Sequence, residues 1–262
     1  MAITYIGAGS WDEGTNLTSV TPTINGSAQE NDFMIAYCHN SQNAAAKTWD
    51  DDGGGGNGWT RLDYNRTTSG RDRETAIYYK KHSGTESDPT FTIGGSGSHS
   101  SGVIETFRGV DATNPFDVTY STASHFTAGS NNSLPTNDSI TTVTDGAWVV
   151  INHMATHDDI TVAGAPTGYT VRANLVGSNK DHRQSIVATK EIVTAGAESP
   201  GAWTHTASPT NVQEYHLYTL ALKPSGQDLR IDQWGITFTE PSGGGGTRSM
   251  RQLIGHGQGT RT

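Results

Sequence analysis

The sequence has one cysteine, no long apolar run and no recognisable leader segment. These features argue against an internal disulfide, a membrane-spanning helix and a secretion signal, in that order. Cys38 is the only cysteine in 262 residues, so no internal disulfide forms. It lies in the apolar segment 33–38, where we expect a small core residue. No run of 18 apolar residues occurs, which argues against a membrane-spanning helix. The N-terminal residues carry neither a basic stretch nor an apolar run, so we expect synthesis in a cytoplasm without a secretion signal.

Positive charge and catalytic motifs are also scarce. Charged residues make up 16% of the chain and the net charge is −9, which disfavours nucleic acid as a partner because phosphate binding needs clustered Lys and Arg. The chain lacks a Gly-x-Ser-x-Gly elbow, a phosphate-binding loop and a His-Glu-x-x-His motif. Glu105 and Glu191 could in principle form a glycosidase pair, but nothing singles them out. We therefore expect no enzymatic activity.

Turn-forming residues are abundant. The chain has 32 glycines and only 32% apolar residues, and no segment shows a helical period with caps. Strand-like segments separated by Gly, Asn, Asp, Ser and Pro recur along the chain, which predicts an all-β fold. The segment 147–151 is continuously apolar, as expected for a strand covered on both faces.

The chain contains a weak copy of itself. Residues 73–80 recur at 183–190 and residues 58–60 at 168–170, both with a shift of 110. Upstream, residues 32–37 match 145–150 with a shift of 113, which makes the intervening loop three residues longer in the first copy. A period near 110 has the size of a β-sandwich unit. We expect a jelly-roll-like β-sandwich built from two halves, residues 1–112 and 113–224.

The C-terminal part differs in composition from both halves. Residues 225–240 are apolar enough for one or two extra strands, and a run of four glycines then opens the segment 241–262. Such a run behaves as a flexible tether, so this segment is either a disordered terminus or an arm that docks on a neighbouring subunit. The candidate docking residues of the arm are Arg248, Met250, Arg251, Leu253 and Ile254.

Two polar clusters could bind metal. The first occupies the loop that is longer in the first copy and consists of Asp50, Asp51, Asp52 and Asn57. Their oxygens suit Ca²⁺, but the spacing does not match an EF-hand, so an acidic solvated loop is the alternative. The second cluster consists of His153, His157, Asp158 and Asp159, which have ligand types that suit Zn²⁺ but no partner cluster to complete a site.

Aromatic residues near segment ends suggest sugar recognition, since ring faces stack on sugars and polar neighbours bind hydroxyls. Trp59 and Tyr169 occupy matching positions in the two copies, which indicates a packing role. Trp11 and Trp49 have no aromatic counterpart, and we expect them to be the better candidates for a surface contact.

Several short motifs together resemble a β-sandwich module of tailed-bacteriophage virion proteins. The motifs cover most of residues 1–224 and lie at 7–10, 31–36, 58–60, 76–80, 101–111, 114–115, 145–150 and 217–224. The resemblance implies a tail-fibre, baseplate or capsid-decoration component, without catalytic residues to carry over.

We therefore expect a non-enzymatic virion structural protein on the particle exterior, made in the host cytoplasm. Its partners would be other virion proteins and further copies of itself, as a homo-oligomer such as a trimer, with no nucleic acid and no membrane insertion. The alternative is a carbohydrate-binding adhesin that contacts glycans on the host surface. No cofactor is expected apart from the Ca²⁺ considered above.

Overall fold

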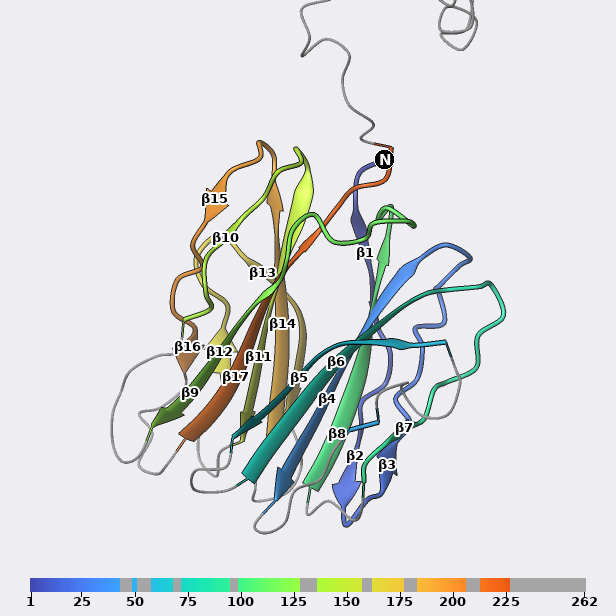
Figure 1. Cartoon of the computed structure of the whole chain (residues 1–262), viewed down its shortest axis with the longest axis vertical. Coiled ribbons are helices and arrows are strands. Elements are labelled where there is room, and N and C mark those ends of the chain that lie inside the picture. The colour runs from blue at the N-terminus through green and yellow to red at the C-terminus, as the bar shows by residue number, and fades with distance from the viewer. Residues whose placement is uncertain are drawn as a thin grey trace, which may run out of the picture. The chain divides into compact units, whose positions relative to one another are not determined.

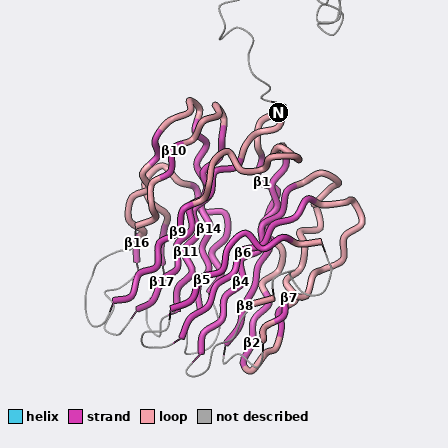
Figure 2. The backbone as a smooth tube through the Cα atoms, in the orientation of Figure 1, coloured by secondary structure: helices cyan, strands magenta, loops and turns pink. Residues whose placement is uncertain are grey.

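The computed structural model describes the body of the chain, and all described residues belong to one compact unit, Met1–Gln227. The described residues are 1–42, 49–50, 58–67, 72–94, 99–127, 136–156, 162–176, 183–205 and 213–226. Every regular element among them is a strand, and none is a helix that could cross a membrane (Figure 2). The all-β expectation is confirmed.

The first sheet is built by the first half of the chain. Its strands are β1 (Thr4–Ala8), β2 (Asp12–Thr15), β4 (Phe33–Gln42), β5 (Thr60–Thr67), β6 (Asp72–Lys81) and β8 (His99–Arg108). The strand order is β1-β8-β4-β6-β5, and β2 pairs with the other end of β8. All pairings are antiparallel.

The second sheet is built by the second half and repeats this arrangement. Its strands are β9 (Ser121–Thr127), β11 (Ala147–Thr156), β13 (Thr170–Val176), β14 (Arg183–Ile192) and β17 (Gln213–Leu222). The order is β13-β14-β11-β17-β9, so β4, β5, β6 and β8 correspond to β11, β13, β14 and β17. The predicted duplication is therefore present as two sheets of the same topology (Figure 1).

Strand register corrects one shift of the internal repeat. Lys80 pairs with Met34, and its counterpart Lys190 pairs with Val149, so the shift for β4 and β11 is 115 and not 113. The turns before these strands agree, because Asn31 and Gly146 both have a positive φ, of 73° and 74°. The shift is 115 between β4 and β11 but 110 between β6 and β14. The chain between β4 and β6 is therefore five residues longer than the chain between β11 and β14.

Three short strand pairs cover the outer faces of the two sheets. They are β3 (Ser19–Val20) with β7 (Phe91–Thr92), β10 (Ile140–Thr141) with β15 (Ala197–Glu198), and β12 (Val162–Gly164) with β16 (Thr204–His205). On the first sheet Phe91 packs with Trp59 and Tyr78. On the second, Trp203 packs with outer-face residues such as Ile151 and Ala188.

The main core lies between the inner faces of the two sheets. Phe33, Ile35 and Tyr37 of β4 share one cluster with Val150 and Leu220 of the second sheet. The residues between them on β4 point outward and are also apolar, because the short strand pairs cover that side. This explains the continuous apolar run at 147–151 and confirms the sandwich. Each half of the chain builds one of the two sheets of this sandwich.

The two sheets face each other with reversed strand order. Edge strand β1 of the first sheet lies beside edge strand β13 of the second, where the Tyr5 hydroxyl is 3.5 Å from the Arg172 carbonyl oxygen. On the opposite side, Tyr120 before β9 donates a hydrogen bond of 3.1 Å to Asp63 of β5. Corresponding pairs of edge strands, β1 with β13 and β9 with β5, therefore meet on the two sides of the sandwich.

Candidate functional site

The two tryptophans selected from the sequence differ in exposure. Trp49 is 0% exposed and belongs to the cluster on the outer face of the first sheet, where it forms an isolated bridge with Ile93. The expectation of a surface contact is wrong for Trp49, because its ring fills the core that covers the sheet. Trp11 is partly buried against the main core, and its indole nitrogen is buried.

Most of the other selected residues lie outside the described part of the chain. Asp50 is exposed, whereas Asp51, Asp52 and Asn57 are not described, and no group of metal-ligating residues occurs among the described ones. His153 lies within β11 and is buried next to Trp203 and Tyr215, while 157–159 are not described. The arm residues Arg248, Met250, Arg251, Leu253 and Ile254 also lie outside the described residues.

Packing aromatics occupy the expected places. Trp59 is buried, and Tyr169 packs against the outer-face cluster of the second sheet. Tyr169 also donates a hydrogen bond of 3.1 Å to Glu198, which forms an ion pair of 2.7 Å with Lys190. The first half has the matching ion pair between Lys80 and Glu86, at 2.6 Å. These paired contacts stabilise the framework in both halves.

A buried carboxyl group between the sheets is the most unusual chemical feature of the described body. Glu105 of β8 is 0% exposed and faces the main core from the first sheet. Its Oε2 accepts a hydrogen bond from the Tyr5 hydroxyl. Its Oε1 and the hydroxyl of buried Tyr37 have no hydrogen-bond partner among the described residues. We call Glu105, Tyr5, Tyr37 and Arg172 the Glu105 cluster.

Arg172 supplies the positive charge of the Glu105 cluster from the edge of the second sheet. Its guanidinium lies over the rings of Tyr5 and Trp148, 5.3 and 5.2 Å from the ring centres. Its Nε donates a hydrogen bond of 2.8 Å to the Thr189 hydroxyl. The side chain is thus turned toward the sheet interface.

Burial dominates the acid–base behaviour of the Glu105 cluster. Removal from water raises the pKa of Glu105 to about 7, against the opposing effects of the Tyr5 hydrogen bond and the Arg172 charge. Burial also raises the pKa of Tyr5, and the Glu105 charge raises it further. The pKa of Tyr37 is raised for the same two reasons. Both tyrosines therefore stay neutral, and Glu105 changes charge near neutral pH.

Apolar residues occupy the equivalent positions of Glu105, Arg172 and Tyr5 in the opposite half of the chain. Glu105 corresponds to Leu220, Arg172 to Leu62, and Tyr5 to Phe116. Phe116 packs edge-on against Phe33 and Tyr79 of the facing sheet. Because an apolar packing is available to this fold, the polar residues are a departure that costs desolvation energy. The sequence carried a usable signal, since Glu105 aligns with a leucine of the repeat.

A second polar group links the sheets on the β6 and β17 side. The Thr75 hydroxyl lies 2.7 Å from Nδ1 of His216 and 2.9 Å from the Tyr218 hydroxyl, and all three side chains are buried. Thr75 belongs to the first sheet, and the other two residues belong to the second. This contact cross-links the sheets.

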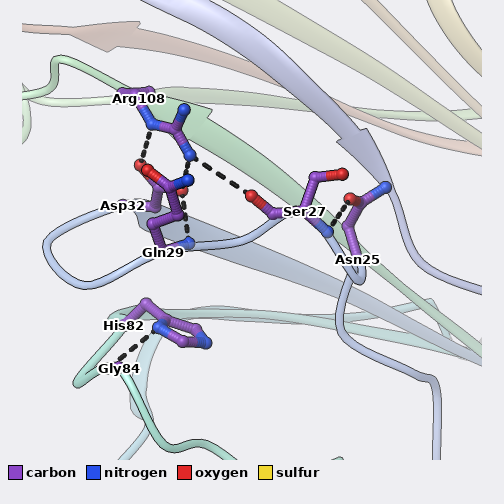
Figure 3. Close-up of polar contacts among 7 residues, drawn as sticks. All are labelled: Asn25, Ser27, Gln29, Asp32, His82, Gly84 and Arg108. Atoms are coloured by element: carbon purple, nitrogen blue, oxygen red, sulfur yellow. Dashed lines mark hydrogen bonds and ion pairs between the residues drawn. The ribbon is translucent and has the colours of Figure 1, made fainter.

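Asp32 and Arg108 form a polar cluster at the end of the first sheet (Figure 3). Arg108 donates hydrogen bonds of 2.8 and 2.9 Å to the two carboxylate oxygens of Asp32, and one of 3.2 Å to the Ser27 carbonyl. The Gln29 amide donates to the same carboxylate at 2.8 Å. Asp32 is buried and immediately precedes β4, so this pair joins the start of β4 to the end of β8.

These clusters share one property, which is that their polar atoms connect strands or sheets. Asp32 forms an ion pair with Arg108, and Thr75 forms a hydrogen bond with His216. The Glu105 carboxyl is buried away from solvent. The arrangement can hold a framework together and can take up a proton at Glu105. No family model, curated protein or solved structure matches this chain in the three comparisons made.

Proposed function

We propose that this chain is a non-enzymatic structural protein of a tailed-bacteriophage virion, placed on the particle exterior as a tail-fibre, baseplate or capsid-decoration component. The observation that supports this proposal is that the polar clusters of the described body join strands to one another or one sheet to the other. A duplicated sandwich of this kind suits a rigid building block.

The residues on which the phage resemblance rests contact one another. Asp32 of the 31–36 motif binds Arg108 of the 101–111 motif. Asp111 of the same motif forms an ion pair of 3.6 Å with Lys223 of the closing 217–224 motif. The Asp111 amide also donates a hydrogen bond of 2.8 Å to the Lys223 carbonyl. A structural module keeps such residues for its framework, which agrees with the proposal.

Assembly would use strand edges, the segment 225–240 and the arm 241–262, with other virion proteins and further copies of this chain as partners. The net charge of −9 suits a surface that faces solvent and host and not packaged DNA. The host cytoplasm is the proposed place of synthesis.

Purified particles test this proposal. Mass spectrometry and gold-labelled antibodies against the body should find the chain in intact particles, at many copies and accessible from outside. Absence from purified particles, or labelling only after they are opened, would overturn the exterior structural role.

The adhesin alternative depends on Trp11 now that Trp49 is buried. The Trp11 indole nitrogen is also buried, so a sugar would meet only part of the ring. A glycan array with the purified chain separates the two functions, because a structural component should show no binding. Binding that is lost in Trp11→Ala but kept in Trp11→Phe would favour the adhesin.

A further inference from the structure

The two sheets meet along two seams that are closed in different ways. At one seam, β1 of the first sheet lies beside β13 of the second, and the Tyr5 hydroxyl is 3.5 Å from the Arg172 carbonyl oxygen. At the other, the start of β9 lies beside β5, and the Tyr120 hydroxyl donates a hydrogen bond of 3.1 Å to Asp63. We call these contacts the β1–β13 seam and the β5–β9 seam.

A buried acid lies directly behind the β1–β13 seam. Ala8 of β1 is the register partner of Glu105, whose side chain is 0% exposed. The Glu105 Oε2 accepts a hydrogen bond from Tyr5, and its Oε1 has no hydrogen-bond partner among the described residues. An ionised carboxyl that is removed from water is costly unless its oxygens are hydrogen-bonded and its charge is paired. The closed seam therefore suits the protonated acid better than the anion.

Arg172 of β13 faces Glu105 but is held by other groups. Its guanidinium lies over the rings of Tyr5 and Trp148, and its Nε donates a hydrogen bond to the Thr189 hydroxyl. The other titratable groups that face Glu105 are Tyr5 of β1 and Tyr37 of β4, and the raised pKa values of both keep them neutral. In setting the pKa of Glu105, burial outweighs the charge of Arg172. The closed seam thus compensates an ionised Glu105 only in part.

Both strands of the β1–β13 seam are irregular beside the Glu105 cluster. The pairing of β1 with β8 shifts register between Tyr5 and Gly7, and the pairing of β13 with β14 shifts register between Val171 and Ala173. Such a bulge interrupts the ladder of backbone hydrogen bonds. Each strand also stands at the end of its sheet in the strand order, so a displacement of either leaves the pairing of the other strands in place.

The opposite side of the sandwich has a separate connection. The Thr75 hydroxyl of β6 contacts His216 and Tyr218 of β17, and all three side chains are buried. This contact joins the sheets far from β1 and does not involve Glu105. A change of charge at Glu105 therefore acts on one side of the sandwich.

We propose that the β1–β13 seam is a pH-sensitive contact, which is closed while Glu105 carries a proton and opens locally to water when Glu105 ionises, while the β5–β9 seam stays closed. Water that enters the seam supplies the hydrogen bonds that the carboxylate lacks, and the proton passes to solvent. This property goes beyond the proposed structural function and does not depend on it.

The size of the response follows from the two states of Glu105. An open seam returns the pKa of Glu105 from about 7 to its ordinary value of 4.5. The equilibrium constant for opening should then rise roughly 70-fold between pH 5 and pH 8, because the open state releases its proton first.

Amide hydrogen exchange of the wild-type protein at low urea concentrations detects this opening even when the open state is rare. After correction for the intrinsic exchange rate, the protection of β1 and β13 amides should fall roughly 70-fold from pH 5 to pH 8. At pH 8 these amides should exchange through an opening that urea hardly promotes, since it exposes little surface. Amides of β5 and β9 should exchange only through unfolding, which urea promotes.

A pair of matched variants identifies the acid. Glu105→Gln cannot ionise, so the protection of its β1 and β13 amides should no longer fall with pH. The control is Asp63→Asn, which removes a carboxylate at the β5–β9 seam and keeps an oxygen that can accept the Tyr120 hydrogen bond. This control should retain the response to pH at β1 and β13.

Three results would each overturn the pH-sensitive seam. Equal urea dependence at β1, β13, β5 and β9 would mean that the seam does not open locally. Protection that ignores pH, or that falls equally in Glu105→Gln, would mean that Glu105 does not control the seam. Protection that rises with pH would mean that Arg172 pairs with the carboxylate and closes the seam. None of these results bears on whether the chain is found in particles.

Discussion

The buried carboxyl of Glu105 should make the folded protein less stable as the pH rises toward neutrality. Its pKa is about 7 in the folded state, compared with an ordinary value of 4.5. The folded protein therefore keeps a proton that the unfolded chain releases between these values. The stabilisation from this proton is complete below pH 4.5 and is lost as the pH rises through 7.

The size of the effect follows from the two pKa values. One pKa unit corresponds to about 1.4 kcal/mol, so the rise from 4.5 to about 7 corresponds to about 3 kcal/mol in the free energy of unfolding. This is a large fraction of the stability of a typical domain. The groups that face Glu105 are the guanidinium of Arg172 and the hydroxyls of Tyr5 and Tyr37, and the raised pKa values of both tyrosines keep their hydroxyls neutral over this range.

Glu105→Gln and Glu105→Leu remove the titrating group. Gln keeps the size of the side chain, and Leu is the residue at the matching position of the second half. Urea unfolding followed by tryptophan fluorescence gives the free energy of unfolding of each protein at pH 4.5 to 8. Relative to wild type, both variants should gain about 3 kcal/mol as the pH rises across this range. The difference in free energy of unfolding between variant and wild type removes the contribution of all other titrating groups, because they are the same in both proteins.

Two results would refute this reasoning. Parallel pH curves for wild type and variants would mean that Glu105 does not change protonation on folding. A wild-type protein that gains stability over the variants with rising pH would mean that the carboxylate is stabilised as an anion, with the Arg172 charge outweighing burial.

Three further predictions concern packing and assembly. Asn137 accepts a hydrogen bond of 2.8 Å from the buried Trp203 indole, so Asn137→Ala should lower the free energy of unfolding by about 1 to 3 kcal/mol; an unchanged urea midpoint would contradict the contact. Trp49→Ala should cost about 3 to 5 kcal/mol and Trp11→Ala clearly less, because only Trp49 is fully buried; equal thermal shifts would argue against this difference. Deletion of 241–262 should reduce incorporation into particles without moving the melting temperature of the body, and unchanged incorporation would exclude the arm.

Sequence periodicity and composition were enough to predict the architecture. Few charges, many turn formers and the 110-residue repeat predicted an all-β sandwich of two halves, because these signals reflect strand length and spacing. The predicted shift of 113 between residues 32–37 and 145–150 was two less than the shift of 115 between β4 and β11 that strand register shows. An error of two leaves every side chain on the correct face of a strand, so the apolar pattern could not reveal it.

The candidate site was predicted less well, for a physical reason. Trp49 was judged a surface residue because it has no aromatic counterpart, yet it is buried in the cluster on the outer face of the first sheet, where it forms a bridge with Ile93. Comparison of the halves sets Glu105 against a leucine, but its partners Tyr5 and Arg172 could not be predicted, since they approach it from strands distant in the sequence. Pairings of that kind depend on how the two sheets pack, which local patterns do not encode.

The central claim is that the duplicated body is an external building block of a phage particle. Labelling intact purified particles with antibodies against residues 1–226, combined with quantitative mass spectrometry of the same particles, tests it most directly. We expect many copies per particle, all accessible before the particle is opened. Particles that lack the chain, or that expose it only after disruption, would contradict the claim.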